Sequence, residues 1–112
     1  MSMFFPTSDE CARHDIFPGV RISTCACEKL MLSYVELEPG AVVAEHSHPH
    51  EQVGMMIEGQ AQFFIGDENK ILSKGDMWRI PGGVKHRVVA LGKPGDIVRA
   101  LDIFTPIRED YL

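Results

Sequence analysis

Apolar and β-branched residues gather in short segments along this chain, and Gly, Pro and Asp separate the segments. We expect strands at 20–27, 30–38, 41–48, 53–57, 60–65, 77–80, 84–91 and 97–105. Runs of this length between turn residues are typical of strands. No segment has the length and 3.6-residue period of an ordinary helix. Many short strands without a helix predict an all-β sandwich or barrel.

The two ends of the chain and one internal segment do not fit the strand pattern. Residues 1–19 contain Pro6, Pro18 and Gly19, so we expect an irregular N-terminal arm with at most a helical turn in it. Residues 66–70 are polar and begin with Gly, which predicts a hairpin loop. With neither a repeat nor a linker, the sequence predicts one domain over 1–112, with a barrel over 20–105 and a tail over 106–112.

Histidines and a glutamine lie at positions where strands can bring them together. His46 and His48 are two residues apart on one predicted strand, so they share a face with Cα atoms roughly 6.6 Å apart. Pro49 ends that strand, Gln52 follows a short turn, and His86 lies on a later strand. Three imidazoles and an amide would suit a divalent transition metal, although spacing alone also fits surface or core histidines.

The residues around these histidines resemble the two motifs of the cupin superfamily. The first motif reads Gly40, five residues, His46, one residue, His48, a polar side chain, and then Gly59. The second motif reads Gly75, five residues, Pro81, one residue, Gly83, two residues and His86. The resemblance implies a single-domain cupin jelly-roll β-barrel, also called a double-stranded β-helix, with its site in the mouth of the barrel.

Two positions depart from the usual cupin motifs. The first motif usually has Glu where this chain has Gln52, and the second usually ends in Asn where this chain has Ala90. Glu51 is one residue short of the usual position, so we interpret Gln52 as the ligand. The resemblance therefore implies one divalent ion (Ni, Zn, Mn or Fe) that is held by His46, His48, Gln52 and His86.

The last predicted strand carries a carboxylate and an aromatic ring on one face. Asp102 and Phe104 alternate with outward positions and share their face with Val98 and Ala100, so they would line the barrel. A buried carboxylate is either paired for structural reasons or has a perturbed pKa for catalysis. Arg108 follows Pro106, and from the sequence alone it could equally be a solvated surface residue.

The tail makes a second resemblance more specific. The residues Asp-Ile-Phe-Thr-Pro-Ile-Arg-Glu-Asp-Tyr-Leu at 102–112, with His-Ser-His-Pro-His-Glu-Gln at 46–52, are similar to the KdgF family of small single-domain cupins. That family linearises the 4,5-unsaturated monouronates that lyases release from pectin and alginate. The resemblance implies a metal-dependent enzyme in which Asp102 moves protons, Arg108 binds the substrate carboxylate and Phe104 packs on the sugar ring.

Composition excludes some classes of partner. The 112 residues carry a net charge of -5, which argues against a nucleic-acid surface, and no apolar run reaches the ~18 residues of a membrane span. Asp9 and Glu10 argue against a signal peptide, and three cysteines suggest reduced thiols in the cytoplasm. The apolar Met3-Phe4-Phe5 segment leads us to expect a homodimer in which it adds to the partner's sheet.

Two other functions fit the same residues. Cupin folds also host iron-dependent dioxygenases, whose usual ligands are two histidines and one carboxylate; the neutral Gln52 counts against this alternative. A non-catalytic module that binds a sugar or an effector is the second alternative, because fold does not determine function. Such a module would need Arg108 but not the proton-transfer group Asp102.

Overall fold

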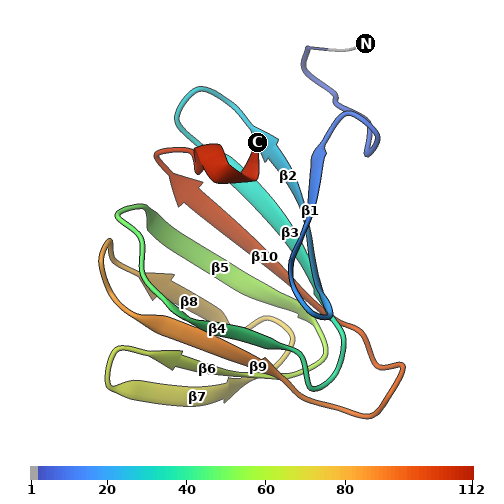
Figure 1. Cartoon of the computed structure of the whole chain (residues 1–112), viewed down its shortest axis with the longest axis vertical. Coiled ribbons are helices and arrows are strands. Elements are labelled where there is room, and N and C mark those ends of the chain that lie inside the picture. Colours follow the sequence, from blue (N-terminus) through green and yellow to red (C-terminus); the bar gives the residue numbers. More distant parts are fainter. Residues whose placement is uncertain (1–2) are drawn as a thin grey trace.

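Two antiparallel sheets make up the computed structural model, which describes residues 3–112 (Figure 1). The six-stranded sheet has the order β1 (Ala12–Phe17), β2 (Val20–Ala26), β3 (Met31–Leu37), β10 (Val98–Thr105), β5 (Glu51–Glu58) and β8 (Met77–Ile80). The four-stranded sheet has the order β4 (Val42–His46), β9 (His86–Ala90), β6 (Ala61–Ile65) and β7 (Glu68–Leu72). The prediction of an all-β jelly-roll domain is confirmed.

The core lies between the sheets and is built from alternate residues of the strands. On β3, Met31, Ser33, Val35 and Leu37 are buried, whereas Leu32 between them is 39% exposed. This alternation follows from the two-residue period of a strand with one face on the core. The apolar core residues come from both sheets: Val20, Ile22, Val35, Leu37, Met56, Ala61, Phe63, Leu72, Trp78, Ile80, Ala90, Val98 and Ala100.

The N-terminal arm is less irregular than the sequence predicted. Ala12–Phe17 form strand β1, which pairs with β2 through a tight turn at Pro18-Gly19, with Phe17 opposite Val20. Gly19 has a φ of 76°, a conformation that glycine adopts without strain. The expected irregular segment at 1–19 is therefore wrong for residues 12–17, because Pro18-Gly19 forms a hairpin turn rather than a break. Residues 1–2 lie outside the described part of the chain.

The predicted hairpin at 66–70 is present, but its loop is shorter than expected. Ile65 pairs with Glu68, so only Gly66 and Asp67 turn the chain and Glu68–Leu72 form strand β7. Gly66 has a φ of 56°, which closes the short turn. The exposed polar residues of β7 suit an edge strand, where one side of the backbone faces water.

The C-terminal tail folds back onto the six-stranded sheet. A short 3-10 helix, η1 (Glu109–Tyr111), lies near the ends of β2 and β10 (Figure 1). The buried Thr24 hydroxyl on β2 donates a 2.8 Å hydrogen bond to the Tyr111 carbonyl oxygen. This bond ties the tail to the sheet and holds the preceding residues close to the cavity. Among residues 3–112, no helix has the length and apolar character needed to cross a membrane.

Candidate metal centre and its cavity

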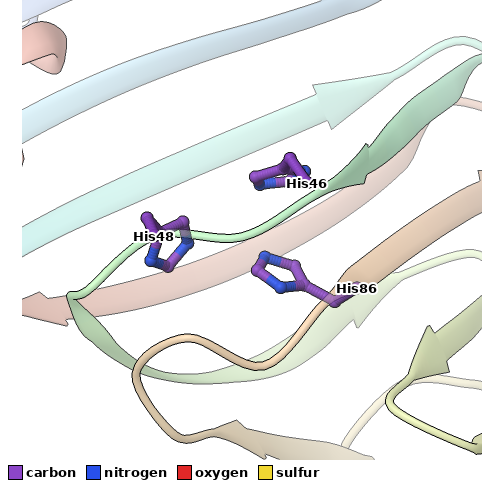
Figure 2. Close-up of side chains that lie close together, drawn as sticks. All are labelled: His46, His48 and His86. Carbon is purple, nitrogen blue, oxygen red and sulfur yellow. The ribbon is translucent and has the colours of Figure 1, made fainter.

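Three histidines from two strands and a loop converge at one end of the four-stranded sheet (Figure 2). His46 ends β4, His86 begins β9 directly opposite it, and His48 lies in the loop after β4. Their potential ligand nitrogens all lie within 4.8 Å of one another. The ring centroids of His46 and His86 are 4.2 Å apart, and those of His48 and His86 are 5.0 Å apart. The structure therefore brings together the three histidines singled out in the sequence.

The hydrogen bonds of the three rings leave one nitrogen of each ring available. Each Nδ1 faces a backbone carbonyl oxygen two residues away along the chain, at 2.8 Å for His46, 3.1 Å for His48 and 2.9 Å for His86. A carbonyl only accepts, so each Nδ1 carries the hydrogen and each Nε2 keeps its lone pair. The Nε2 of His86 is buried and has no partner among the described residues. Histidines that bind metal are typically oriented in this way.

Gln52 on β5 adds a fourth group to the cluster. Its amide nitrogen donates a 2.8 Å hydrogen bond to Asp102 Oδ1, which turns its Oε1 toward His48 Nε2 at 3.1 Å. With Nδ1 of His48 carrying the hydrogen, this contact joins two acceptors, an arrangement that a shared cation would stabilise. The donor set therefore fits one divalent ion. Glu51, the alternative considered in the sequence, is exposed.

Burial favours the neutral form of two of the histidines, His48 and His86. The pKa of His48 is lowered to about 4, chiefly by burial and then by the nearby charges of Arg108 and His86. Burial also lowers the pKa of His86, against the effect of its hydrogen bond to the Val84 carbonyl. Because a metal binds only the neutral ring, these shifts prepare both side chains as ligands at neutral pH.

Asp102 on β10 faces the same cavity from the six-stranded sheet. Its Oδ1 accepts hydrogen bonds from Gln52 and, at 2.9 Å, from Nε1 of Trp78. Burial raises the pKa of Asp102 to about 6, and the two hydrogen bonds and the charge of Arg108 only partly oppose this. A carboxyl with a pKa in this range can both take and give a proton near neutral pH.

Trp78 was not identified from the sequence as a site residue, although Gly54, a glycine inside a predicted strand, was a signal that could have indicated it. Gly54 on β5 is paired with Trp78 on β8 and with Asp102 on β10. A Cβ at Gly54 would overlap the indole ring of Trp78. The missing side chain thus lets the indole cross β5 and reach the carboxylate. A glycine inside a strand often marks such a close approach.

Arg108 is held at the cavity by aromatic rings rather than exposed on the surface. Its side chain is only 11% exposed, and Nη2 lies 3.0 Å from Asp110 Oδ2. The guanidinium carbon lies 4.0 Å from the ring centroid of Tyr111 and 5.3 Å from that of Phe104. Arg108 Nε is buried without a partner among residues 3–112. Tyr111 was also missed in the sequence, because its role depends on how the tail folds.

These side chains meet around one cavity of about 60 Å³. Its polar lining consists of Ser33, His46, Gln52, His86, Asp102 and Arg108, and Phe104 and Tyr111 also line it. The volume exceeds the roughly 10–15 Å³ that one water molecule requires. All the predicted site residues therefore lie in or beside one pocket between the sheets, and the rest of its lining is mostly apolar.

Comparisons with known proteins agree with this architecture. Residues 33–104 match the family model described as the cupin domain. Among curated proteins, oxalate decarboxylase OxdC of Bacillus subtilis is 30% identical over 80 residues, which cover 67% of this chain and 21% of OxdC. The chain thus spans about a fifth of the length of that relative.

Two solved structures are similar over nearly the whole chain. KdgF from Halomonas sp. is 34% identical, with a TM-score of 0.84 and coverage of 96% of this chain and 99% of KdgF. An RmlC-like cupin from Shewanella frigidimarina is 27% identical, with a TM-score of 0.85 and coverage of 99% and 97%. The expected likeness to KdgF is confirmed. On the evidence of the matched domain, the fold and these relatives, the chain belongs to the cupin family.

Proposed function

We propose that this chain is a metal-dependent enzyme that opens the ring of 4,5-unsaturated monouronates and releases their linear keto form. Its similarity to KdgF over nearly the full length of both chains supports this reaction. The observation that carries the proposal is that Asp102 and Arg108 line the same cavity as His46 and His86. A proton-transfer group, a carboxylate-binding cation and a candidate metal centre are therefore available to one small anionic sugar.

The chemistry of the substrate requires two proton movements and no oxidant. An unsaturated monouronate is a cyclic hemiacetal whose ring oxygen is also an enol-ether oxygen. Removing the proton of the anomeric hydroxyl forms the C1 carbonyl, breaks the bond from C1 to the ring oxygen and leaves an enolate at C5. A proton delivered to C4 then converts the enolate to a ketone. The reaction is an isomerisation, because the substrate loses one proton and gains another.

We assign the proton transfers to Asp102. Its Oδ1 is held by Gln52 and Trp78, which fixes the carboxyl group inside the cavity. A pKa of about 6 allows this group to accept the hydroxyl proton and later return a proton to C4. Two hydrogen bonds to one oxygen leave the second carboxyl oxygen to exchange protons with the substrate.

We assign the substrate carboxylate to Arg108. A guanidinium can bind a carboxylate through two parallel hydrogen bonds, and Arg108 still has an unpartnered Nε among the described residues. Asp110 contacts Nη2 from the solvent side and is 60% exposed. Phe104 lines the cavity and contacts the ring of His48, and we propose that it also packs on the sugar ring.

The ligands of the metal in this proposal are His46, His48, Gln52 and His86. A divalent ion bound there would supply Lewis-acid polarisation of substrate oxygens without a change of oxidation state. Nickel, zinc, manganese and iron are the candidates. An iron dioxygenase is disfavoured by the ligand set, because an amide lies beside His48 where a carboxylate would be expected. Oxygen consumption after iron reconstitution would support the dioxygenase instead.

We also propose that the protein is a homodimer in the cytoplasm. Met3, Phe4 and Phe5 are at least 80% exposed and precede the edge strand β1, so they could add to the sheet of a second copy. The outer face of the six-stranded sheet also exposes Met77 and Val53. A monomer mass in sedimentation at micromolar concentration would reject the dimer. The free cysteines support a reducing compartment.

The test is to identify the product. Metal-replete protein is mixed with a single purified unsaturated monouronate, and the sugar is followed by NMR. The proposal expects the linear keto form to appear faster than in the spontaneous reaction and without oxygen. Binding of the sugar without any acceleration would favour the non-catalytic module.

A further inference from the structure

One buried hydroxyl in the cavity has no role in the proposed function. Ser33 lies in the middle of β3, is 1% exposed and lines the cavity. Its Oγ has no hydrogen-bond partner among the described residues. A buried polar group without a partner destabilises a protein, so nearly all such groups are paired. Ser33 is therefore in the condition expected of a group whose partner is a bound molecule.

Ser33 differs from the residues paired with it on the two neighbouring strands, which have hydrogen-bond partners in the protein. Ser33 is directly opposite Thr24 on β2 and directly opposite Asp102 on β10. Thr24 donates to the Tyr111 carbonyl, and Asp102 accepts from Trp78. In this row of inward-facing polar side chains, the residues on both sides of Ser33 have hydrogen-bond partners in the protein, whereas Ser33 Oγ has none among the described residues.

The register also places Ser33 next to the group that moves protons. Directly opposite residues in an antiparallel pair have Cβ atoms about 4.5–5.5 Å apart. The Ser33 hydroxyl and the Asp102 carboxyl can therefore reach the same ligand atom. A serine hydroxyl carries no charge and can donate and accept at once. It suits a sugar hydroxyl, whereas the substrate carboxylate is matched by Arg108.

We propose that Ser33 is a substrate-binding residue that hydrogen-bonds the sugar hydroxyl whose proton Asp102 removes. This inference rests on the proposed function for the identity of the sugar. Ser33 Oγ would fix the orientation of that hydroxyl toward the carboxyl group, and Asp102 would remain the proton acceptor. The sugar would then be held by a neutral contact from Ser33 on β3 and by a charged contact from Arg108 in the tail.

The experiment compares wild-type protein with the Ser33→Ala variant in three measurements. The first is kcat/KM on a single unsaturated monouronate, which we expect to fall about 10-fold, the upper end of the loss of one neutral hydrogen bond. The second is the rise in thermal midpoint caused by galacturonate, a saturated and unreactive uronate, which should be smaller in the variant. The third is the thermal midpoint without ligand, which should stay the same or rise, because no hydrogen bond is lost.

Thr24→Val is the matched control for the third measurement. Its hydroxyl is also buried but bonds the Tyr111 carbonyl, so its removal should lower the midpoint. If Ser33→Ala lowers the midpoint as Thr24→Val does, Ser33 has a structural partner and the inference is wrong. Equal responses of wild type and Ser33→Ala, in both turnover and galacturonate binding, would also overturn it. A weaker galacturonate response in Ser33→Ala supports Ser33 even if wild type opens no ring, which would reject only the proposed function.

Discussion

The two sheets contribute different chemistry to one cavity. The four-stranded sheet and the loop after β4 contribute three nitrogen donors, His46, His48 and His86. The six-stranded sheet and the tail contribute the protic and charged groups: Ser33, Gln52, Asp102 and Arg108. Gln52 joins the two groups, because its amide contacts both His48 and Asp102. The cavity thus has a histidine wall and a polar wall, and these names are kept below.

Burial shifts the pKa values of His48 and Asp102 in opposite directions, but in both groups it favours the neutral form. It lowers the pKa of His48 to about 4 and raises that of Asp102 to about 6. In both cases the neutral form is favoured, because a charge loses its hydration inside the protein. One buried environment therefore prepares an imidazole as a metal ligand and a carboxyl as a proton carrier.

The largest effect should come from breaking the histidine wall. We expect His86→Ala to lose its metal and nearly all turnover, since losing even an outer partner of a ligand costs roughly 10–100-fold in affinity. Metal content per chain, measured by mass spectrometry after dialysis, checks this. His14→Ala, which removes a histidine outside the cluster, should keep its ion. Full metal content in His86→Ala would remove this residue from the ligand set.

On the polar wall, Asp102→Asn should lower turnover by about 10²–10⁴-fold, the usual contribution of general acid–base catalysis. The asparagine Oδ1 can still accept from Gln52 and Trp78, so metal content should stay normal. Steady-state kinetics and metal analysis on the same sample measure both quantities. Ring opening at the wild-type rate in Asp102→Asn would mean that another group moves the protons.

Arg108→Ala should chiefly weaken substrate binding. A charge-assisted hydrogen bond contributes about 1.5–3 kcal/mol, which corresponds to a rise in KM of roughly 10–150-fold. Turnover at saturating substrate should change much less. Arg13→Ala, an exposed arginine on β1, is the matched control and should keep the wild-type KM. An unchanged KM in Arg108→Ala would place the substrate carboxylate elsewhere.

The smallest effect concerns the stability of metal-free protein against pH. His48 has a lowered pKa, so its contribution to stability is present above pH 6.5 and is lost as the pH falls toward about 4. Asp102 has a raised pKa, so its contribution is present below pH 3.8 and is lost as the pH rises through about 6. The two contributions oppose each other between pH 4 and 6.5, and wild type should change little from these groups.

Replacing the carboxyl should expose the effect of the histidine. In metal-free Asp102→Asn, the contributions of His48 and His86 remain without the opposing carboxyl, so stability should fall more steeply than in wild type as the pH drops from 6.5 to 4. Urea denaturation at several pH values measures the difference. Parallel curves for the two proteins would show that Asp102 does not titrate in this range.

The histidine wall could be predicted from the sequence because its geometry is local. The expected single strand over 41–48 was wrong, because β4 ends at His46 and His48 lies in the following loop. The three residues were still predictable as neighbours, since His46, His48 and Gln52 are close in the sequence and the turn after β4 folds them together. His86 required the family resemblance, since its strand is distant in the sequence. Asp102 was placed correctly on the inward face by its alternation with Ala100.

The residues that hold Asp102 and Arg108 in place could not be predicted from the sequence in the same way. Strand β5 lies between the strands of Trp78 and Asp102, and Trp78 reaches across it only because Gly54 has no side chain. Tyr111 holds Arg108 only after the tail has folded back and bonded Thr24. Ser33 Oγ lacks a hydrogen-bond partner among the described residues because of how β3 is paired with β2 and β10. These facts depend on contacts across the fold, which no local pattern contains.

The most direct test of the central claim is to follow the absorbance of a 4,5-unsaturated monouronate mixed with the protein under nitrogen. We expect absorbance to fall well above the spontaneous rate with metal-replete wild type, because the histidine wall and the polar wall act on one such sugar. This excess rate should disappear after chelation and fall about 10²–10⁴-fold in Asp102→Asn. Absorbance that declines only at the spontaneous rate with metal-replete wild type would show that the two walls do not act together on this sugar.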